Sequence, residues 1–269
     1  MSTLTSYTSG TRPSASSNTG LCIFRSDTDA IEVSDGTSWQ TYNSDGASAT
    51  FPSNNYSVDF DGSNDYIDIT GASGLFNSAT AFSISLWYYA DAYGGAMFGS
   101  SASSTNGVWL LPYSGSGTNF YFSVRNGGNT FISTASPALN QWVHVAATYN
   151  AGSGTLYLTP SGGSTTTTSS SSLPSSLSAT AGANLSIGRQ SVQNLYFNGK
   201  VDEVAIWNRE INSTEVSNII NNNEYSNASA MWRLENTADA TIGGSGYNGT
   251  MNNFVSPHGF VSGAGNTPY

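Results

Sequence analysis

The sequence predicts an all-β fold built from two stacked antiparallel sheets, and three observations support this prediction. Short apolar runs alternate with polar residues at a period of two through the middle of the chain. Gly, Ser, Thr and Asn fill the gaps between these runs, as expected of turns. Only 9% of the residues are charged, which argues against long amphipathic helices. A chain of 269 residues suffices for one large sandwich with short flanking segments.

Nine segments between residues 50 and 210 show the alternation that turns every second side chain toward a core. They are residues 56–60, 66–69, 82–87, 108–110, 120–124, 142–146, 156–158, 185–187 and 201–207. We expect these segments to form the strands of the two sheets. The tract from Thr165 to Ser172 consists of Thr and Ser and has no apolar side chain to bury. We therefore expect it to be an exposed loop.

One short helix is predicted from Asn212 to Asn221. Asn212 can cap the helix, and Glu215, three residues later, can reach back to it. Val216, Ile219 and Ile220 then form an apolar stripe along one side. We expect this helix to cover one edge of the sandwich.

Residues 1–46 differ from the rest of the chain and are expected to form an N-terminal β-hairpin arm. Two apolar runs, residues 21–24 and 30–33, flank an acidic turn at residues 26–29. An isolated hairpin is marginal in water, so this arm should serve for attachment or oligomerisation. The predicted organisation is therefore an arm over residues 1–46, a sandwich over 47–230, and a C-terminal segment over 231–269.

The charge balance restricts the partners of this chain. It carries 17 acidic and seven basic residues, a formal net charge of -10. With no positive field to attract phosphate, we expect no nucleic-acid partner. No segment reaches the roughly 20 apolar residues of a membrane span, and no export signal is expected. Cys22 is the only cysteine, so the chain cannot form an internal disulfide.

Four segments together resemble the laminin-G-like family of jelly rolls. Residues 56–67 (YSVDFDGSNDYI) resemble the opening strand and turn, and residues 82–87 (FSISLW) resemble the next core strand. Residues 141–149 (QWVHVAATY) and 199–209 (GKVDEVAIWNR) follow in the order and spacing of the family. The resemblance covers about residues 50–222. It implies a concanavalin A-like jelly roll that serves as a binding and structural module.

The C-terminal segment adds a further similarity. Residues 231–234 (MWRL) and 247–251 (YNGTM) resemble a strand pair that usually precedes the opening strand in this family. This segment either folds back to complete the sandwich or remains from a lost second repeat. We favour completion, because an orphaned strand containing a Trp would leave an exposed, adhesive edge.

A short motif in the arm indicates a biological setting. Residues 10–14 (GTRPS) and 27–39 (DTDAIEVSDGTSW) resemble a motif of tailed-phage virion proteins. This resemblance implies a non-enzymatic virion surface protein, assembled in the host cytoplasm, that decorates the capsid or belongs to the tail. Its expected partners are other virion proteins through the arm, a second copy of the chain, and a host surface glycan. The alternative is a carbohydrate-binding module of a cellular surface or secreted protein.

Three carboxylates are candidate ligands for a structural Ca²⁺ ion. Asp61 and Asp65 lie in one predicted turn, and turn carboxylates suit hard cations. Asp202 belongs to the motif that supplies a structural calcium ligand in some relatives of the family. The alternative is an ordinary Asx turn together with an unrelated strand carboxylate.

Tyr93, Trp109 and Tyr113 are candidate glycan-binding residues, because they lie beside loops and aromatic faces stack on sugar rings. The alternative is that they pack in the sheets. Catalysis is not expected. Asp202 and Glu203 are the adjacent acidic pair on a convincing strand, and consecutive strand residues point to opposite faces. His144, inside a strand, is expected to be a packed residue and no catalytic base.

Overall fold

The computed structural model describes residues 6–8, 10–18, 21–25, 30–34, 37, 39–43, 55–113, 118–238, 240–242, 245–262, 265 and 267–268. The chain divides into two compact units. Residues 1–53 with 221–226 form the smaller unit, and residues 54–220 with 227–269 form the larger one.

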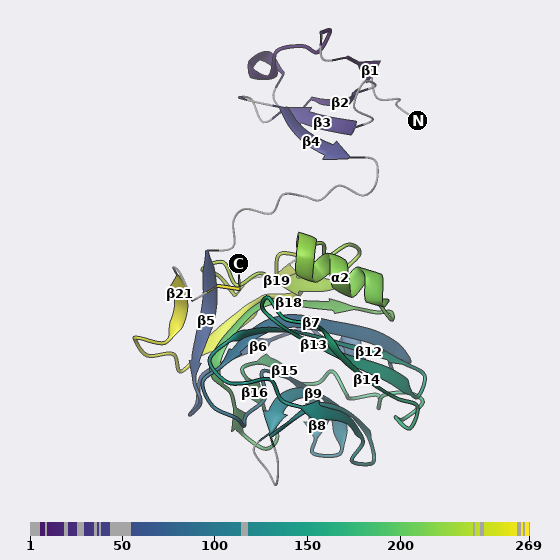
Figure 1. Cartoon of the computed structure of the whole chain (residues 1–269), viewed down its shortest axis with the longest axis vertical. Coiled ribbons are helices and arrows are strands. Elements are labelled where there is room, and N and C mark those ends of the chain that lie inside the picture. Colours follow the sequence, from purple (N-terminus) through teal and green to yellow (C-terminus); the bar gives the residue numbers. More distant parts are fainter. Residues whose placement is uncertain are drawn as a thin grey trace. The chain divides into compact units, whose positions relative to one another are not determined.

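The larger unit is a sandwich of a seven-stranded and an eight-stranded sheet (Figure 1). The seven-stranded sheet consists, in spatial order, of β11 (Phe131–Ala135), β10 (Asn119–Asn126), β9 (Asn106–Tyr113), β8 (Phe98–Ser103), β15 (Leu185–Ile187), β6 (Tyr66–Ile69) and β20 (Gly249–Asn252). The eight-stranded sheet consists of β14 (Thr166–Ser170), β13 (Ser153–Pro160), β12 (Trp142–Asn150), β7 (Ala81–Ala90), β18 (Asn198–Trp207), β5 (Tyr56–Asp61) and β21 (Gly259–Ser262), with β19 (Ala230–Trp232) paired to β18. Each of the nine predicted segments lies within one of these strands, so the predicted fold class is confirmed.

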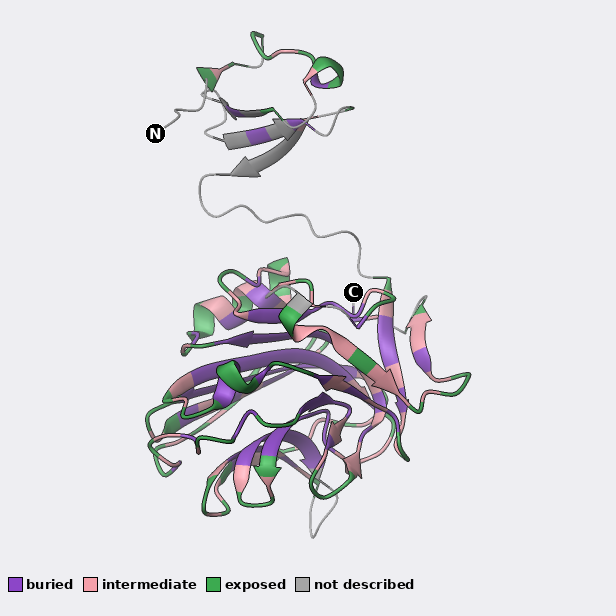
Figure 2. Cartoon of the chain, turned by 180° about the vertical axis from the view of Figure 1, so that it is seen from behind, coloured by how far each residue is buried: buried purple, intermediate pink, exposed green. Residues whose placement is uncertain are grey.

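A single apolar layer fills the space between the two sheets. Figure 2 shows buried residues along the strands of both sheets, and their apolar members form one cluster. Phe76, Phe82 and Phe98 are among the largest of them, and the Phe76 and Phe82 rings meet edge to face with centroids 5.2 Å apart. Aromatic pairs of this geometry add to the stabilisation from apolar burial.

Helix α2 (Ser213–Asn222) confirms the predicted short helix. The Asn212 side chain accepts hydrogen bonds from the backbone N–H groups of Thr214 and Glu215, and Glu215 accepts one from the backbone of Asn212. This reciprocal arrangement is a capping box. The structure adds a one-turn helix, α1 (Ser73–Phe76), and two short 3-10 turns, Ala15–Ser17 and Ser245–Tyr247. No helix in the described part of the chain is long and apolar enough to cross a membrane.

The prediction of an exposed loop from Thr165 to Ser172 is wrong. Residues Thr166–Ser170 form β14, which pairs with β13 at the end of the eight-stranded sheet. Most of its side chains are exposed, as the composition indicated, but backbone hydrogen bonding to a neighbouring strand needs no apolar side chain. The hydroxyls of Thr155 and Ser169 add a cross-strand contact of 3.0 Å.

The C-terminal residues supply strands to both sheets. β19 pairs with β18, β20 with β6, and β21 with β5. Trp232 of β19 is completely buried in the layer between the sheets, and its indole N–H donates to the backbone oxygen of Tyr247 at 2.7 Å.

His144 of β12 is a packed residue. It is completely buried, its Nε2 lies 2.8 Å from the hydroxyl of Ser85, and its ring contacts Trp87 edge to face. Burial lowers the pKa of His144 to about 3, because the charged imidazolium is costly away from water.

The smaller unit contains a four-stranded sheet in which the predicted hairpin is the central pair. Its strands are β1 (Ser6–Tyr7), β2 (Cys22–Arg25), β3 (Ala30–Ser34) and β4 (Trp39–Asn43). Arg12 donates two hydrogen bonds to the carboxylate of Glu32 at 2.9 and 3.1 Å, and the indole of Trp39 donates to the backbone oxygen of Pro13. These contacts attach residues 12 and 13 to the sheet. The acidic turn at 26–29 lies outside the described residues.

Candidate ligand-binding groove

A groove of about 470 Å³ lies on the face of the seven-stranded sheet that points away from the core. The alternation of the strands creates this face. Val108 and Leu110 of β9 enter the layer between the sheets, whereas Trp109 and Leu111 belong to a separate apolar cluster. We call the site the outer groove. Its lining residues are Ala96, Trp109, Leu111, Tyr121, Ser123, Arg125, Asn129, Phe131, Gln190, Gln193 and Leu195.

One side of the outer groove is formed by a hairpin of β16 (Arg189–Gln190) and β17 (Leu195–Tyr196). Gln190 is completely buried; its amide donates to the hydroxyl of Ser101 and its oxygen accepts from the backbone of Gln193. Gly99 of β8 allows the hairpin to approach, since a Cβ there would lie 2.7 Å from the backbone oxygen of Arg189. The hairpin therefore holds Gln190 and Gln193 in fixed positions.

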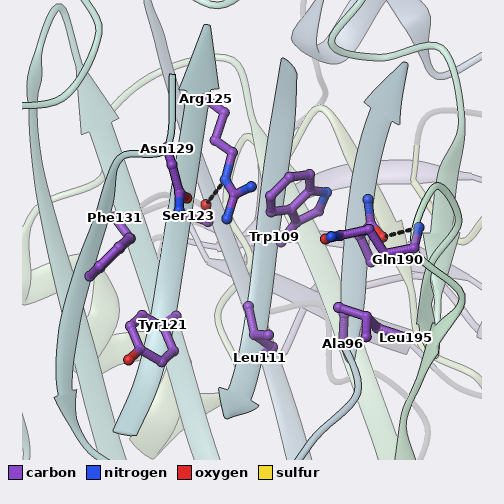
Figure 3. A pocket seen from close by; sticks show the side chains of 11 residues that line it. Ala96, Trp109, Leu111, Tyr121, Ser123, Arg125, Asn129, Phe131, Gln190 and Leu195 are labelled. Atoms are coloured by element: carbon purple, nitrogen blue, oxygen red, sulfur yellow. Dashed lines mark hydrogen bonds between the residues drawn. The ribbon is translucent and has the colours of Figure 1, made fainter. Parts of the chain in front are cut away.

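The opposite side carries two aromatic rings. β10 and β11 pair so that Ser123 lies across from Phe131, and the Tyr121 and Phe131 rings meet at 86° with centroids 4.9 Å apart. Phe131 is 44% exposed, which is unusual for a large apolar side chain. Figure 3 shows both rings across the groove from Gln190 and Leu195. Together they offer an apolar surface to a ligand.

Arg125 is held above Trp109 in the middle of the site (Figure 3). Its guanidinium carbon lies 4.0 Å from the centre of the Trp109 ring. Its Nε donates to the hydroxyl of Ser123 at 2.8 Å, and Nη1 donates to the backbone oxygen of Ser104 at 2.7 Å. Partial burial lowers the pKa of Arg125, although an arginine stays protonated in proteins.

The structure brings one of the three predicted glycan-binding residues into the outer groove. That residue is Trp109. Tyr93 is not among the lining residues, and its hydroxyl donates to the backbone oxygen of Pro137 at 3.1 Å. The side chain of Tyr113 lies outside the described part of the structure. Tyr121, Phe131 and Arg125 were missed because they come from neighbouring strands and share a face only once the sheet has formed.

The turn after β5 is an Asx turn. The carboxylate of Asp61 accepts hydrogen bonds from the backbone N–H groups of Ser63 and Asn64 at 2.7 and 3.1 Å. Burial opposes ionisation of Asp61, but these backbone donors outweigh it, so its pKa lies below the ordinary value. Asp65 accepts from the backbone of Asp61 at 3.1 Å, which places both residues in the same turn.

Asp202 does not lie at this turn. Asn198 of β18 is the residue opposite Asp61, so Asp202 is four positions farther along the strand, a separation of about 13 Å. Among the described residues, no three His, Cys, Asp or Glu side chains gather closely enough to hold a metal ion. The calcium ion stays a prediction.

The expectation that Asp202 and Glu203 point to opposite faces by simple alternation is wrong. The register shifts between Asp202 and Ala205, and Glu203 adopts a φ of 50°, so an extra residue enters the strand. Val201 and Val204 both lie in the layer between the sheets, and both carboxylates between them are buried.

Glu203 forms an interior ion pair. Arg233 donates to its Oε1 from Nε at 2.9 Å and from Nη2 at 2.8 Å. Burial raises the pKa of Glu203 to about 7, with the hydrogen bonds from Arg233 opposing that rise. Glu203 lies in β18 and Arg233 directly follows β19, so the pair links the C-terminal segment to the sandwich. Neither residue lines the outer groove.

The two antiparallel sheets and their shared core define a jelly-roll sandwich. Residues 61–217 match the family model of the concanavalin A-like lectin/glucanases superfamily. This match covers more than half of the chain, and the chain belongs to that superfamily.

Solved structures align with this chain at low sequence identity. A candidate carbohydrate-binding protein from Bacteroides ovatus aligns with a TM-score of 0.57 and 18% identity, over 77% of this chain and 60% of that protein. A heptameric pentraxin from Limulus polyphemus aligns at 0.49 and 15% identity, over 78% and 92%. A tailspike protein of an Escherichia coli O157:H7 bacteriophage aligns at 0.48 and 11% identity, over 71% and 31%. This chain thus spans three-fifths of the Bacteroides protein. No curated protein matches the sequence.

Proposed function

We propose that this chain is a non-enzymatic glycan-binding protein whose sugar site is the outer groove. The observation that carries this proposal is the Tyr121–Phe131 pair, in which Phe131 is exposed and Tyr121 half-buried, at the same groove as Trp109, Gln193 and Asn129. Aromatic faces stack on the apolar faces of sugar rings, and amide side chains can bond the hydroxyls. The groove volume of about 470 Å³ is typical of small-ligand sites. The fold shared with the Bacteroides ovatus protein agrees with this proposal.

The composition of the groove favours binding without hydrolysis. Most glycosidases place two Asp or Glu side chains across the scissile bond. None of the residues lining the outer groove is acidic. The buried Glu203 is already engaged by Arg233 and is absent from the groove lining.

The glycan proposal is tested with the Phe131→Ala and Tyr121→Ala variants on a glycan array, followed by titration calorimetry. We expect each variant to weaken binding of a recognised glycan about tenfold or more, because central aromatic contacts at binding sites typically exceed 1 kcal/mol. The matched control is Val255→Ala, which shortens a side chain that is 72% exposed and lies outside the groove. Wild-type affinity in Phe131→Ala and Tyr121→Ala would contradict the proposal.

The setting that we propose is the surface of a bacteriophage particle, as a capsid decoration or tail-associated protein. The arm would bind other virion proteins and the groove a host surface glycan. The packing of Arg12, Glu32 and Trp39 supports the arm as an ordered unit. The alternative, a carbohydrate-binding module of a cellular surface or secreted protein, needs no particle partner.

Deletion of residues 1–46 separates these two settings. We expect the shortened protein to keep the unfolding transition and glycan binding of the larger unit, because that unit has its own core. It should no longer co-sediment with purified particles of the phage that encodes it. Normal attachment of the shortened protein would refute the proposed role of the arm, and failure of the full chain to co-sediment would favour the cellular module.

A further inference from the structure

The outer groove carries a positive charge, whereas the chain as a whole has a net negative charge. The chain contains 17 acidic and seven basic residues. Of the residues that line the groove, Arg125 alone is charged, and it is a cation. An anion therefore meets a positive charge there, with no carboxylate in the groove lining to repel it.

Arg125 is positioned to bind an anion. Its Nε and Nη1 are fixed by Ser123 and Ser104, and its flat face is fixed by Trp109. Within the described part of the chain, its Nη2 has no acceptor. An arginine that is already oriented loses little conformational freedom when it binds a carboxylate or sulfate, and such charge-assisted bonds are the stronger kind.

Trp109 supplies a second unsatisfied donor at the same place. The residue is 2% exposed, and its buried indole Nε1 has no hydrogen-bond partner among the described residues. An indole N–H can only donate, so a ligand oxygen is the group that completes it. Figure 3 shows the Trp109 ring between Arg125 and Gln190, so both donors belong to the same part of the groove.

We infer that the outer groove selects an acidic glycan, one whose carboxylate or sulfate binds Arg125 while its sugar rings stack on Tyr121 and Phe131. The inference rests on the proposed function of the groove as a sugar site. Tyr121, Ser123 and Arg125 project from the same face of β10, and Tyr121 and Arg125 are about 13 Å apart along the strand. This spacing suits a short oligosaccharide with its charged group at one end. Arg125 is the specificity-determining residue.

The test compares acidic glycans with neutral counterparts on the full-length protein. The probes are sialyllactose against lactose, trigalacturonic acid against its methyl ester, and a heparin-derived tetrasaccharide against its desulfated form. The first two pairs test a carboxylate and the third tests a sulfate. We expect the acidic glycan of at least one pair to bind more tightly than its neutral counterpart by about tenfold or more. A hydrogen bond to a charged group contributes enough binding free energy for this difference. Arg125→Gln should reduce that preference to about one, and Arg125→Lys should keep part of it.

Arg209→Gln is the matched control, because Arg209 pairs with Glu215 at helix α2 and does not line the groove. It should keep the full preference. Equal binding of both members of every pair by the wild-type protein, with loss in Phe131→Ala, would overturn the acidic preference and leave the glycan site intact. Absence of binding to any glycan would instead remove the proposed function. The comparison of probes on the wild-type protein decides the matter even if an Arg125 variant fails to fold.

Discussion

Replacing Arg233 by methionine is expected to lower the free energy of unfolding by about 3–5 kcal/mol at pH 8. The side chain of Glu203 is completely buried and that of Arg233 is 4% exposed, so the substitution leaves a carboxylate in the interior without its cation. Removing one member of a buried ion pair costs more than the pair contributes, because the remaining charge is neither solvated nor paired. Urea denaturation followed by tryptophan fluorescence measures the effect.

The pH dependence separates an orphaned charge from lost packing. The folded-state pKa of Glu203, about 7, already lies above its ordinary value of 4.5, and loss of Arg233 should raise it further. A group whose pKa is higher in the folded state contributes less stability as the pH rises through that pKa. The deficit of Arg233→Met should therefore be larger at pH 8 than near pH 5, by about 1.4 kcal/mol, which is the linkage equivalent of the one pH unit that separates pH 8 from the wild-type pKa of about 7. Adding Glu203→Gln to the same chain should remove this pH dependence. A deficit that stays constant with pH would show that packing alone was lost.

The strands could be predicted because their alternation reflects burial. Each of the nine predicted segments lies in a strand, and the Asn212–Glu215 capping box could be recognised from two residues at a fixed spacing. These signals are local. β14 was not predicted, because an edge strand of Thr and Ser is held by backbone hydrogen bonds and a hydropathy pattern does not report these bonds.

The bulge at Glu203 shows a second reason for error. The alternation rule assumes one residue per position, and the extra residue between Val201 and Val204 shifts every later side chain by one place. No local sequence pattern around Asp202 predicts this shift. Its partner Arg233 comes from thirty residues later, so only the folded chain shows why a carboxylate is tolerated there.

The outer groove was only partly predictable for the same reason. Trp109 could be singled out as an aromatic beside a loop. Arg125, Phe131 and Gln190 join it only through the pairing of β9 with β10, β10 with β11, and the placement of the β16–β17 hairpin. A binding site assembled from several strands depends on register, which composition and spacing do not encode.

Ending the chain after Ser229 is expected to abolish folding of the larger unit. The truncation removes β19, β20 and β21, which pair with β18, β6 and β5. Both sheets would therefore be left with unpaired strand edges. It also removes Trp232 and Leu234 from the shared core, and loss of one large core side chain alone costs about 3–5 kcal/mol. Removing several such side chains at once therefore costs as much free energy as the whole stability of a typical domain. We expect an aggregating product with no cooperative thermal transition in circular dichroism.

The control is a chain that ends after Ser262, which keeps every one of these strands. It loses the hydrogen bond from Trp142 to Gly265, the interaction of Thr267 and the buried Pro268. It should unfold cooperatively, with a small loss of stability, since a typical hydrogen bond contributes only about 1 kcal/mol and the shared core stays whole. A peptide of residues 230–269, added during refolding, should restore a cooperative transition to the shorter chain, since strand pairing with β18, β6 and β5 does not require a covalent link. If the chain ending at Ser229 folds cooperatively by itself, the C-terminal strands are an accessory to the sandwich and no part of its minimal core.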